Sequence, residues 1–376
     1  MKTKFLLILI SIFLLHHKGT FAQSIKQSVQ TALENNESLK TQKVLLDNSY
    51  QNFLIQSGKL LPNLSLNSAG TRSSNLDTSQ ETDSYSISVN SSYMLFDFGS
   101  LNAKKRSAQR LNEASKASFT KFENELIKSV AKVHLELFKA IKIVELYENS
   151  LEVRKQQFMA VKNRFDLGEA TRSDLLRSKA SISGAEAQLK VGQGNVKKFR
   201  EGYKYLVGLA SENPKLPQKI IREPSLLENS VKVALANDLG LKVLKLEEQA
   251  LKEDLSYSEK SRLPNLSLSG ALSYGDNSTS GSNSSSGRIS LTSNLTIYSG
   301  GQKMSQVKIA SNNLAAKAIE IAVRKKLLER DVTTKWVDLM ALRSSAVAKQ
   351  EEVNALKELY ESVFEEWKLG GKTSLD

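Results

Sequence analysis

The chain contains an internal duplication, in which one pattern appears twice at a constant offset of about 202 residues. Its clearest part is the segment Leu-Pro-Asn-Leu-Ser-Leu at Leu61 to Leu66, which returns unchanged at Leu263 to Leu268. Further positions recur at the same offset: Gly99 and Gly301, Leu167 and Leu369, Gly168 and Gly370, Thr171 and Thr373, and Asp174 and Asp376. Because these pairs share one register, the sequence predicts a fold built from two copies of one structural unit.

The N-terminus and the repeat together predict the domain organisation. Lys2 and Lys4 precede an apolar run from Phe5 to Leu15, and small residues follow up to Ala22, which indicates a signal peptide over 1–22 rather than a buried first helix. The first repeat is then expected over 23–210, a linker over 211–225 and the second repeat over 226–376. The second repeat reaches only Asp376, the counterpart of Asp174, so the pattern predicts a C-terminal truncation that removes its last helix.

Each repeat is expected to run helix, two strands, long helix and return helix. Apolar and polar residues alternate before the long helix, which places one set on each face of a sheet. The apolar set on the best strand is Tyr85, Ile87, Val89, Tyr93 and Leu95, and serines and asparagines occupy the positions between them. The polar stretches Ser73 to Asp83 and Gly275 to Gly287 are predicted to be hairpin loops.

Long helices follow the strand pairs. No proline or glycine interrupts Leu101 to Phe165, and its apolar residues recur mostly at steps of three, four or seven. The second copy repeats this spacing from Val307 to Leu339. Such a narrow apolar stripe stabilises little by itself, so these helices are expected to pack in a coiled-coil-like array.

The predicted strands require more than one chain. An open sheet in a membrane would expose unpaired amides and carbonyls to hydrocarbon, at several kcal/mol per group. Four strands are also too few to close a barrel, for which about eight is the usual minimum. Three copies would supply twelve strands.

The order of these elements resembles the TolC family of outer-membrane efflux proteins. The resemblance is carried by the duplicated helix–strand–strand–helix–helix unit, by the Leu-Pro-Asn-Leu-Ser-Leu segments, and by the helix ends at Phe165 to Gly168 and Trp367 to Gly370. It implies a mainly α fold with membrane β structure, in which long helices form a periplasmic α-barrel and four strands per protomer join a trimeric, 12-stranded outer-membrane β-barrel.

The same resemblance implies the function and the partners. It predicts a homotrimeric outer-membrane channel that extends into the periplasm and passively exports small molecules or proteins, in a tripartite efflux or type I secretion system. The expected partners are a periplasmic adaptor protein, an inner-membrane pump and outer-membrane lipid. The alternative is a periplasmic coiled-coil structural or adaptor protein, which would not explain the alternating strands.

Two groups of candidate residues follow from the helix ends. The adaptor-contact candidates at the two tips are Phe165, Leu167, Gly168, Trp367, Leu369 and Gly370. The resemblance also places candidate entrance or gate residues at Asp174, Lys372 and Asp376, with a possible Asp174–Lys372 contact. Structural roles compete with both, since the glycines fit helix C-caps and Thr171 with Asp174 fits a capping box.

The residue inventory argues against an enzyme. The chain has no cysteine, and His134 is the one histidine after the signal segment, which leaves no His-cluster metal site or Cys–His pair. No cofactor and no metal are expected, and an exported hydrolase finds no support. The net charge of +13 would suit nucleic acid, but export and the mixing of lysines with glutamates along helices favour a solvated surface instead.

Overall fold

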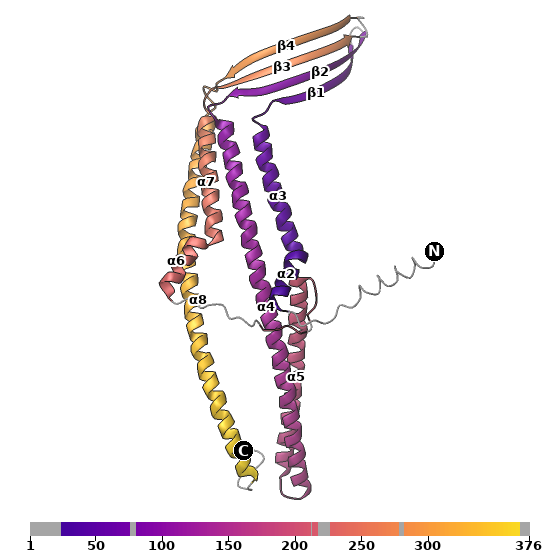
Figure 1. Cartoon of the computed structure of the whole chain (residues 1–376). Coiled ribbons are helices and arrows are strands. Elements are labelled where there is room, and N and C mark those ends of the chain that lie inside the picture. The colour runs from indigo at the N-terminus through magenta and orange to yellow at the C-terminus, as the bar shows by residue number, and fades with distance from the viewer. Residues whose placement is uncertain (1–23, 76–79, 212, 217–225, 278–281, 369–376) are drawn as a thin grey trace, which may run out of the picture. The chain divides into compact units, whose positions relative to one another are not determined.

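The computed structural model describes residues 24–75, 80–211, 213–216, 226–277 and 282–368. In the first half, α2 (Ile25–Asn35) and α3 (Glu37–Gly58) precede β1 (Asn63–Asn75) and β2 (Gln80–Phe96), and α4 (Ser100–Asp166) and α5 (Arg172–Val207) follow. The second half repeats the order with α6 (Leu227–Asn237), α7 (Leu239–Lys260), β3 (Asn265–Asn277), β4 (Ser282–Asn294) and α8 (Gln302–Lys368). The element order predicted from the duplication is therefore confirmed (Figure 1).

The chain divides into two compact units that cut across the two repeats. We call one the hairpin unit, comprising Met1–Lys40, Phe122–Asn229 and Thr333–Asp376. The other is the sheet unit, comprising Thr41–Lys121 and Ser230–Val332. Each unit draws segments from both halves of the sequence, so the duplicated stretches are not separate compact bodies. The repeat boundaries at 23–210, 211–225 and 226–376 remain a prediction.

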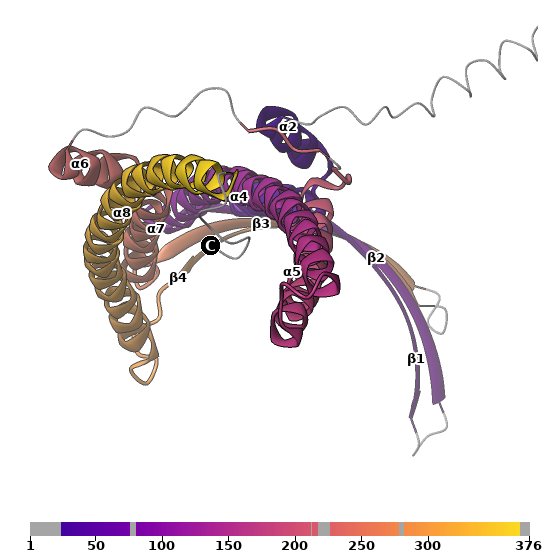
Figure 2. The same ribbon diagram turned by 90° about the horizontal axis from the view of Figure 1, so that it is seen from below.

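The sheet unit contains one four-stranded antiparallel sheet in the order β1-β2-β3-β4, whose strands bend along their length (Figure 2). The strands are longer than the sequence pattern suggested. The predicted loops were too long. Ser73 belongs to β1 and Asp83 to β2, where both pair with the neighbouring strand, and Ser284 to Ser286 belong to β4, where they pair with β3. Their hydrophilic side chains do not prevent the backbone ladder from continuing, since cross-strand hydrogen bonds depend on backbone groups.

In the hairpin unit, α5 runs back along part of α4 after a tight turn (Figure 1). Gly168 has φ 79°, and the Glu169 amide donates to the Arg164 carbonyl at 2.8 Å, so the predicted glycine C-cap is confirmed. Further along, a Cβ on Gly192 would lie 3.0 Å from Tyr147 Cδ2 and 3.2 Å from Val144 Cγ2. The two helices therefore approach closely where α5 has no side chain.

The single helix expected at the start of the first repeat is divided into two helices, α2 and α3. It is divided at Asn36, whose φ of −68° and ψ of 119° are extended. The Asn36 side chain accepts a hydrogen bond from the Leu39 amide at 3.1 Å and donates to the Leu206 carbonyl at 3.0 Å. Asparagine bonds backbone groups in this way readily, so it ends α2 and begins α3.

Exposed apolar residues continue along α8 within the hairpin unit. Val337, Leu342, Val347, Leu356 and Leu359 are each more than half exposed. Among the described residues, the helices lack the length of apolar sequence that crossing a membrane requires. These side chains lie on several sides of the helix, and together they offer apolar surface for packing against other helices.

Candidate membrane sheet and helix tip

One face of the sheet is apolar. The registers place Leu66 opposite Val89, Val89 opposite Leu272, and Leu268 opposite Leu291. These side chains are exposed, with Leu66 and Leu272 both at 67% and Ile289 at 84%. Exposed leucine, isoleucine and valine over four adjacent strands form the type of surface that faces lipid.

The apolar face is bounded by aromatic and charged residues toward the β1–β2 and β3–β4 connections. Tyr85 lies over Gly70, where an added Cβ would be 3.3 Å from its ring, and Tyr274 pairs with Ser285. Beyond Tyr85, Arg72 and Asp83 form a two-pronged ion pair at 2.7 and 2.8 Å. Aromatic belts followed by charges are typical of the boundary between a membrane core and water.

The opposite face carries hydroxyl and amide groups. Rows of cross-strand neighbours contain mostly short polar side chains, such as Asn67, Ser88, Ser273 and Ser286 in one row. Ser273 and Ser286 lie 2.7 Å apart through their hydroxyls. The sheet thus has the apolar-out and polar-in alternation of a strand set that separates lipid from water.

The strands end in turns that require unusual backbone geometry. Phe98 has φ 56° and Gly99 φ 77°, while Gly300 and Gly301 have φ 59° and 81°. Asp97 accepts hydrogen bonds from the amides of Gly99 at 2.9 Å and Leu101 at 2.6 Å, which caps the start of α4. Gly99 and Gly301 therefore allow the left-handed backbone conformation where the strands are followed by helices.

At the tip between α4 and α5, Thr171 and Asp174 form the expected capping box. The Asp174 amide donates to Thr171 Oγ1 at 3.2 Å, and Asp174 Oδ2 accepts from the Thr171 hydroxyl at 2.6 Å and amide at 3.1 Å. These hydrogen bonds hold the pKa of Asp174 below its ordinary value. The structural reading of this pair is confirmed, and Asp174 is partly exposed.

The structure describes some of the remaining tip candidates and not others. Phe165 is partly buried in the last turn of α4, while Leu167 is 75% exposed and Gly168 forms the cap. Trp367 belongs to the last turn of α8. Leu369, Gly370, Lys372 and Asp376 lie outside the described residues, so the Asp174–Lys372 contact stays a prediction.

A buried polar cluster surrounds His134 in the hairpin unit, and its partners were not evident from the sequence. Ser28 Oγ lies 3.0 Å from His134 Nδ1 and accepts a hydrogen bond from the Tyr203 hydroxyl at 2.6 Å. His134 Nε2 lies 2.9 Å from the Lys215 carbonyl, which can only accept, so Nε2 carries the proton. Burial lowers the pKa of His134, although the Lys215 carbonyl opposes this effect.

The His134 cluster is a packing site by its geometry. Ser28, His134 and Tyr203 are each 0% exposed, and the third member is a tyrosine hydroxyl rather than a carboxylate. A serine nucleophile needs access to its substrate as well as a base. In addition, the described residues contain no cluster of histidine, aspartate and glutamate suited to a metal ion.

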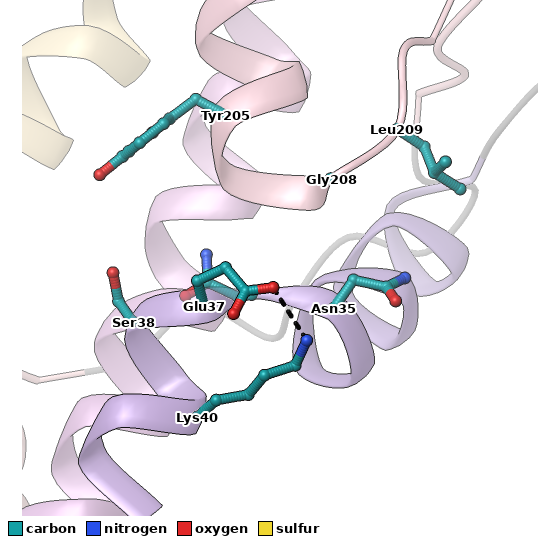
Figure 3. A pocket seen from close by; sticks show the side chains of 8 residues that line it. Asn35, Glu37, Ser38, Lys40, Tyr205, Gly208 and Leu209 are labelled. Atoms are coloured by element: carbon teal, nitrogen blue, oxygen red, sulfur yellow. Dashed lines mark hydrogen bonds and ion pairs between the residues drawn. The ribbon is translucent and has the colours of Figure 1, made fainter.

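A shallow pocket of about 440 Å³ lies beside the break between α2 and α3 (Figure 3). Gly208 caps α5 there with φ 84°, and a Cβ at this position would lie 3.2 Å from Asn35 Cβ. Glu37 and Lys40 form an ion pair at 2.9 Å in the lining, with both side chains mostly exposed. The pocket follows from the capped helix ends and brings no catalytic pair together.

Ion pairs connect helices within the sheet unit. Arg324 Nη2 lies 2.9 Å from Asp238 Oδ2, Lys104 Nζ lies 2.8 Å from Asp254 Oδ1, and Arg106 Nη2 lies 2.8 Å from Glu253 Oε2. Burial would raise the pKa of Asp238, but hydrogen bonds from Arg324 and the Leu241 amide outweigh it and hold the pKa below its usual value. These side chains remain partly exposed.

The comparison with known families decides the identity of this architecture. The family model described as "Outer membrane efflux protein" matches residues 28–201 and 231–376, one match for each half of the duplication. The chain belongs to the outer membrane efflux protein family. Membership places it in the outer membrane and favours an efflux channel over a periplasmic coiled-coil protein.

Relatives support the same family over nearly the whole chain. "Outer membrane efflux protein BepC" of Brucella suis is 23% identical over 371 residues, which cover 98% of this chain and 81% of BepC. "Outer membrane protein TolC" of Vibrio cholerae is 21% identical over 368 residues, covering 95% of this chain and 84% of that protein. Both relatives are named for the outer membrane, where the sequence resemblance had predicted this chain.

A solved structure supports the fold independently of sequence identity. The CmeC outer membrane channel of Campylobacter jejuni matches with a TM-score of 0.78 at 16% identity, covering 93% of this chain and 77% of CmeC. The fold of long helices with four strands is therefore shared with this outer membrane channel.

Proposed function

We propose that three copies of this chain form an outer-membrane channel that passively exports small molecules or proteins. Each protomer contributes β1 to β4 to a shared twelve-stranded barrel, and the long helices continue as a periplasmic tunnel. The proposal is supported by the sheet, which has an apolar face, a hydroxyl face and two edges at β1 and β4. Edge-to-edge pairing between copies would satisfy backbone groups that a single sheet exposes to hydrocarbon.

The native mass of protein extracted by detergent from a purified outer-membrane fraction tests the assembly. A trimer that also conducts ions in a planar bilayer supports the channel. A monomer in that fraction, or a trimer without conductance, contradicts it. Flotation of the chain with outer membranes provides the localisation control.

The exposed α4–α5 tip is proposed to contact a periplasmic adaptor, which would couple the channel to an inner-membrane pump in a tripartite efflux or type I secretion system. Leu167 is the most exposed apolar residue of this tip. Leu167→Glu is expected to lower export while the trimer stays intact, because a charge disfavours an apolar contact. Met159→Glu is the matched control, since Met159 is also an exposed apolar residue of α4. Equal export by the two variants would count against tip docking.

Asp174 and Lys372 are proposed as a gate at the tunnel entrance, with Asp376 as the counterpart of Asp174 in the second repeat. Asp174 is partly exposed, so its ionised carboxylate can pair with a cation while it caps α5. Lys372→Ala is then expected to increase the open fraction in planar bilayers. Thr171→Ala serves as the control for capping, because it weakens the helix start without removing a charge. Unchanged opening of the Lys372 variant would contradict the gate.

A further inference from the structure

The charged residues of the sheet divide unequally between its two faces. Strand positions alternate, so the register assigns each side chain to a face. Arg72, Glu81, Asp83 and Asp276 share the parity of the apolar face and lie toward the connections between paired strands. Within the described strands, Arg288 is the one charged side chain on the hydroxyl face.

Arg288 lies midway along β4, in a row of small neighbours. It pairs with Ala271 on β3, which pairs with Asn90 on β2, which in turn pairs with Ser65 on β1. Ala271 offers only a methyl group, and the row contains no carboxylate. The side chain of Arg288 is exposed, so its guanidinium extends over the polar face without an acidic neighbour in its row.

The adjacent rows on the same face are also uncharged. Ser286 and Ser290 flank Arg288 at the next two positions of β4 on this face, and their cross-strand partners are Ser273 and Ser269. Hydroxyl groups can donate to an anion or accept from a cation, so they favour neither charge. The guanidinium therefore determines the sign of the local field on this face.

We propose that Arg288 is a selectivity-determining residue that makes the barrel lumen favour anionic solutes. This inference rests on the proposed channel, in which the hydroxyl face lines the water-filled lumen. Three copies would place three guanidinium groups around one lumen, and rings of charged side chains select ions of opposite sign. The surrounding low-dielectric wall concentrates this field, so solutes carrying carboxylate, sulfonate or phosphate groups are favoured over cations.

The orientation of Arg288 can be tested without conductance, because the chain has no cysteine. We would introduce Arg288→Cys and, separately, Ile289→Cys into the full chain and reconstitute each in liposomes. A charged, membrane-impermeant thiol reagent is expected to label position 288 and not the neighbouring position 289, which lies on the apolar face. Labelling of 289 with protection of 288 would overturn the inference.

Selectivity is then measured from the reversal potential across a planar bilayer with a potassium chloride gradient. Arg288→Gln is expected to shift the reversal potential toward cation permeability, and Arg288→Glu further in the same direction. Arg288→Lys retains the wild-type value because it keeps the charge. Ser290→Gln, a neutral change on the same face, is expected to cause no shift. Salt at about 1 M should reduce every difference, since the screening length falls to about 3 Å.

The outcomes separate this inference from the proposed channel. A wild-type chain without conductance contradicts the channel, while the labelling pattern still decides whether Arg288 faces water. A conducting wild type with the same reversal potential as Arg288→Gln overturns the role of Arg288 and leaves the channel intact.

Discussion

The hairpin unit and the sheet unit hold their helices together by different polar interactions. In the hairpin unit, Ser28, His134 and Tyr203 form a fully buried, neutral hydrogen-bonded cluster. In the sheet unit, pairs such as Arg324–Asp238 and Arg106–Glu253 are charged and partly exposed. Removing one partner of a buried neutral hydrogen bond costs stability because the other group stays buried and unpaired. Exposed ion pairs contribute less, because water and salt screen them. The two units should therefore respond differently to mutation and pH.

The largest effect is expected for His134→Ala. It leaves the Ser28 hydroxyl and the Lys215 carbonyl with one partner fewer and creates a cavity, which should cost roughly 3 kcal/mol of unfolding free energy. Denaturant unfolding followed by circular dichroism measures it. Lys132→Ala, an exposed change on the same helix, should stay within about 0.5 kcal/mol of wild type. Equal effects of the two variants would contradict a special contribution of the buried cluster to the stability of the hairpin unit.

The next effect separates close packing from hydrogen bonding in the hairpin unit. Gly192→Leu forces a side chain against Tyr147 and Val144 and is expected to destabilise by about 1–3 kcal/mol. Gly194→Leu is the matched control, because nothing lies within 4 Å of its added Cβ. Leucine forms helices better than glycine, so this control should stabilise by roughly 0.5–1 kcal/mol. Thermal unfolding should show midpoints that move in opposite directions.

A smaller effect is expected for an ion pair of the sheet unit. Arg324→Ala removes the partner of Asp238, whose side chain is 18% exposed, and should cost about 1–2 kcal/mol because part of the charge stays hydrated. Arg330→Ala is the control, since its pair with Asp331 is much more exposed, and its effect should be near zero. The contrast between the units would be contradicted by two results together. Added salt would leave the destabilisation by Arg324→Ala unchanged, and Arg330→Ala would lower the unfolding free energy by the same amount.

The smallest effect near neutral pH comes from the titration of His134. Its pKa is lowered in the folded state, so the unfolded state binds the proton more readily, and stability falls as pH drops below the ordinary value of 6.5. The decline should be less than about 1.4 kcal/mol per pH unit, the slope for one proton. The carboxylate of Asp238, whose pKa is also lowered, loses its contribution only in stronger acid. Thermal midpoints of wild type and His134→Gln between pH 7 and pH 5 test this, and parallel curves would contradict it.

The sequence predicted long, uninterrupted elements better than the contacts between distant segments. The spacing of apolar residues located α4 from Ser100 to Asp166, and alternation located β2. The Asn36 break was missed because a single asparagine is compatible with a helix until its partners at Leu39 and Leu206 are known. The serine-rich start of β4 was mistaken for a loop, since its strand character depends on pairing with β3.

In the candidate site, too, local features were predictable and contacts between distant segments were not. Capping at Thr171 and Asp174 depends on residues three apart and was predictable, as was the glycine cap at Gly168. The partners of His134 were not predictable, since Ser28 lies 106 residues away in sequence and no periodic pattern relates them. Arg288 was overlooked because it directly follows Gly275 to Gly287, which was predicted to be a loop. The alternation of apolar and polar residues in the strand that follows extends back to Arg288 and places it with the serines.

The open edges of the four-stranded sheet have a consequence for biogenesis. If β1 and β4 find partners only on other copies, the last hydrogen bonds of each protomer form at the moment of oligomerisation. Folding would then be a multi-molecular event, and the lifetime of a lone protomer would depend on how many sister chains are present. At low abundance, the protomer would keep unpaired strand edges for longer, and these edges are open to proteases and to pairing with the wrong chain.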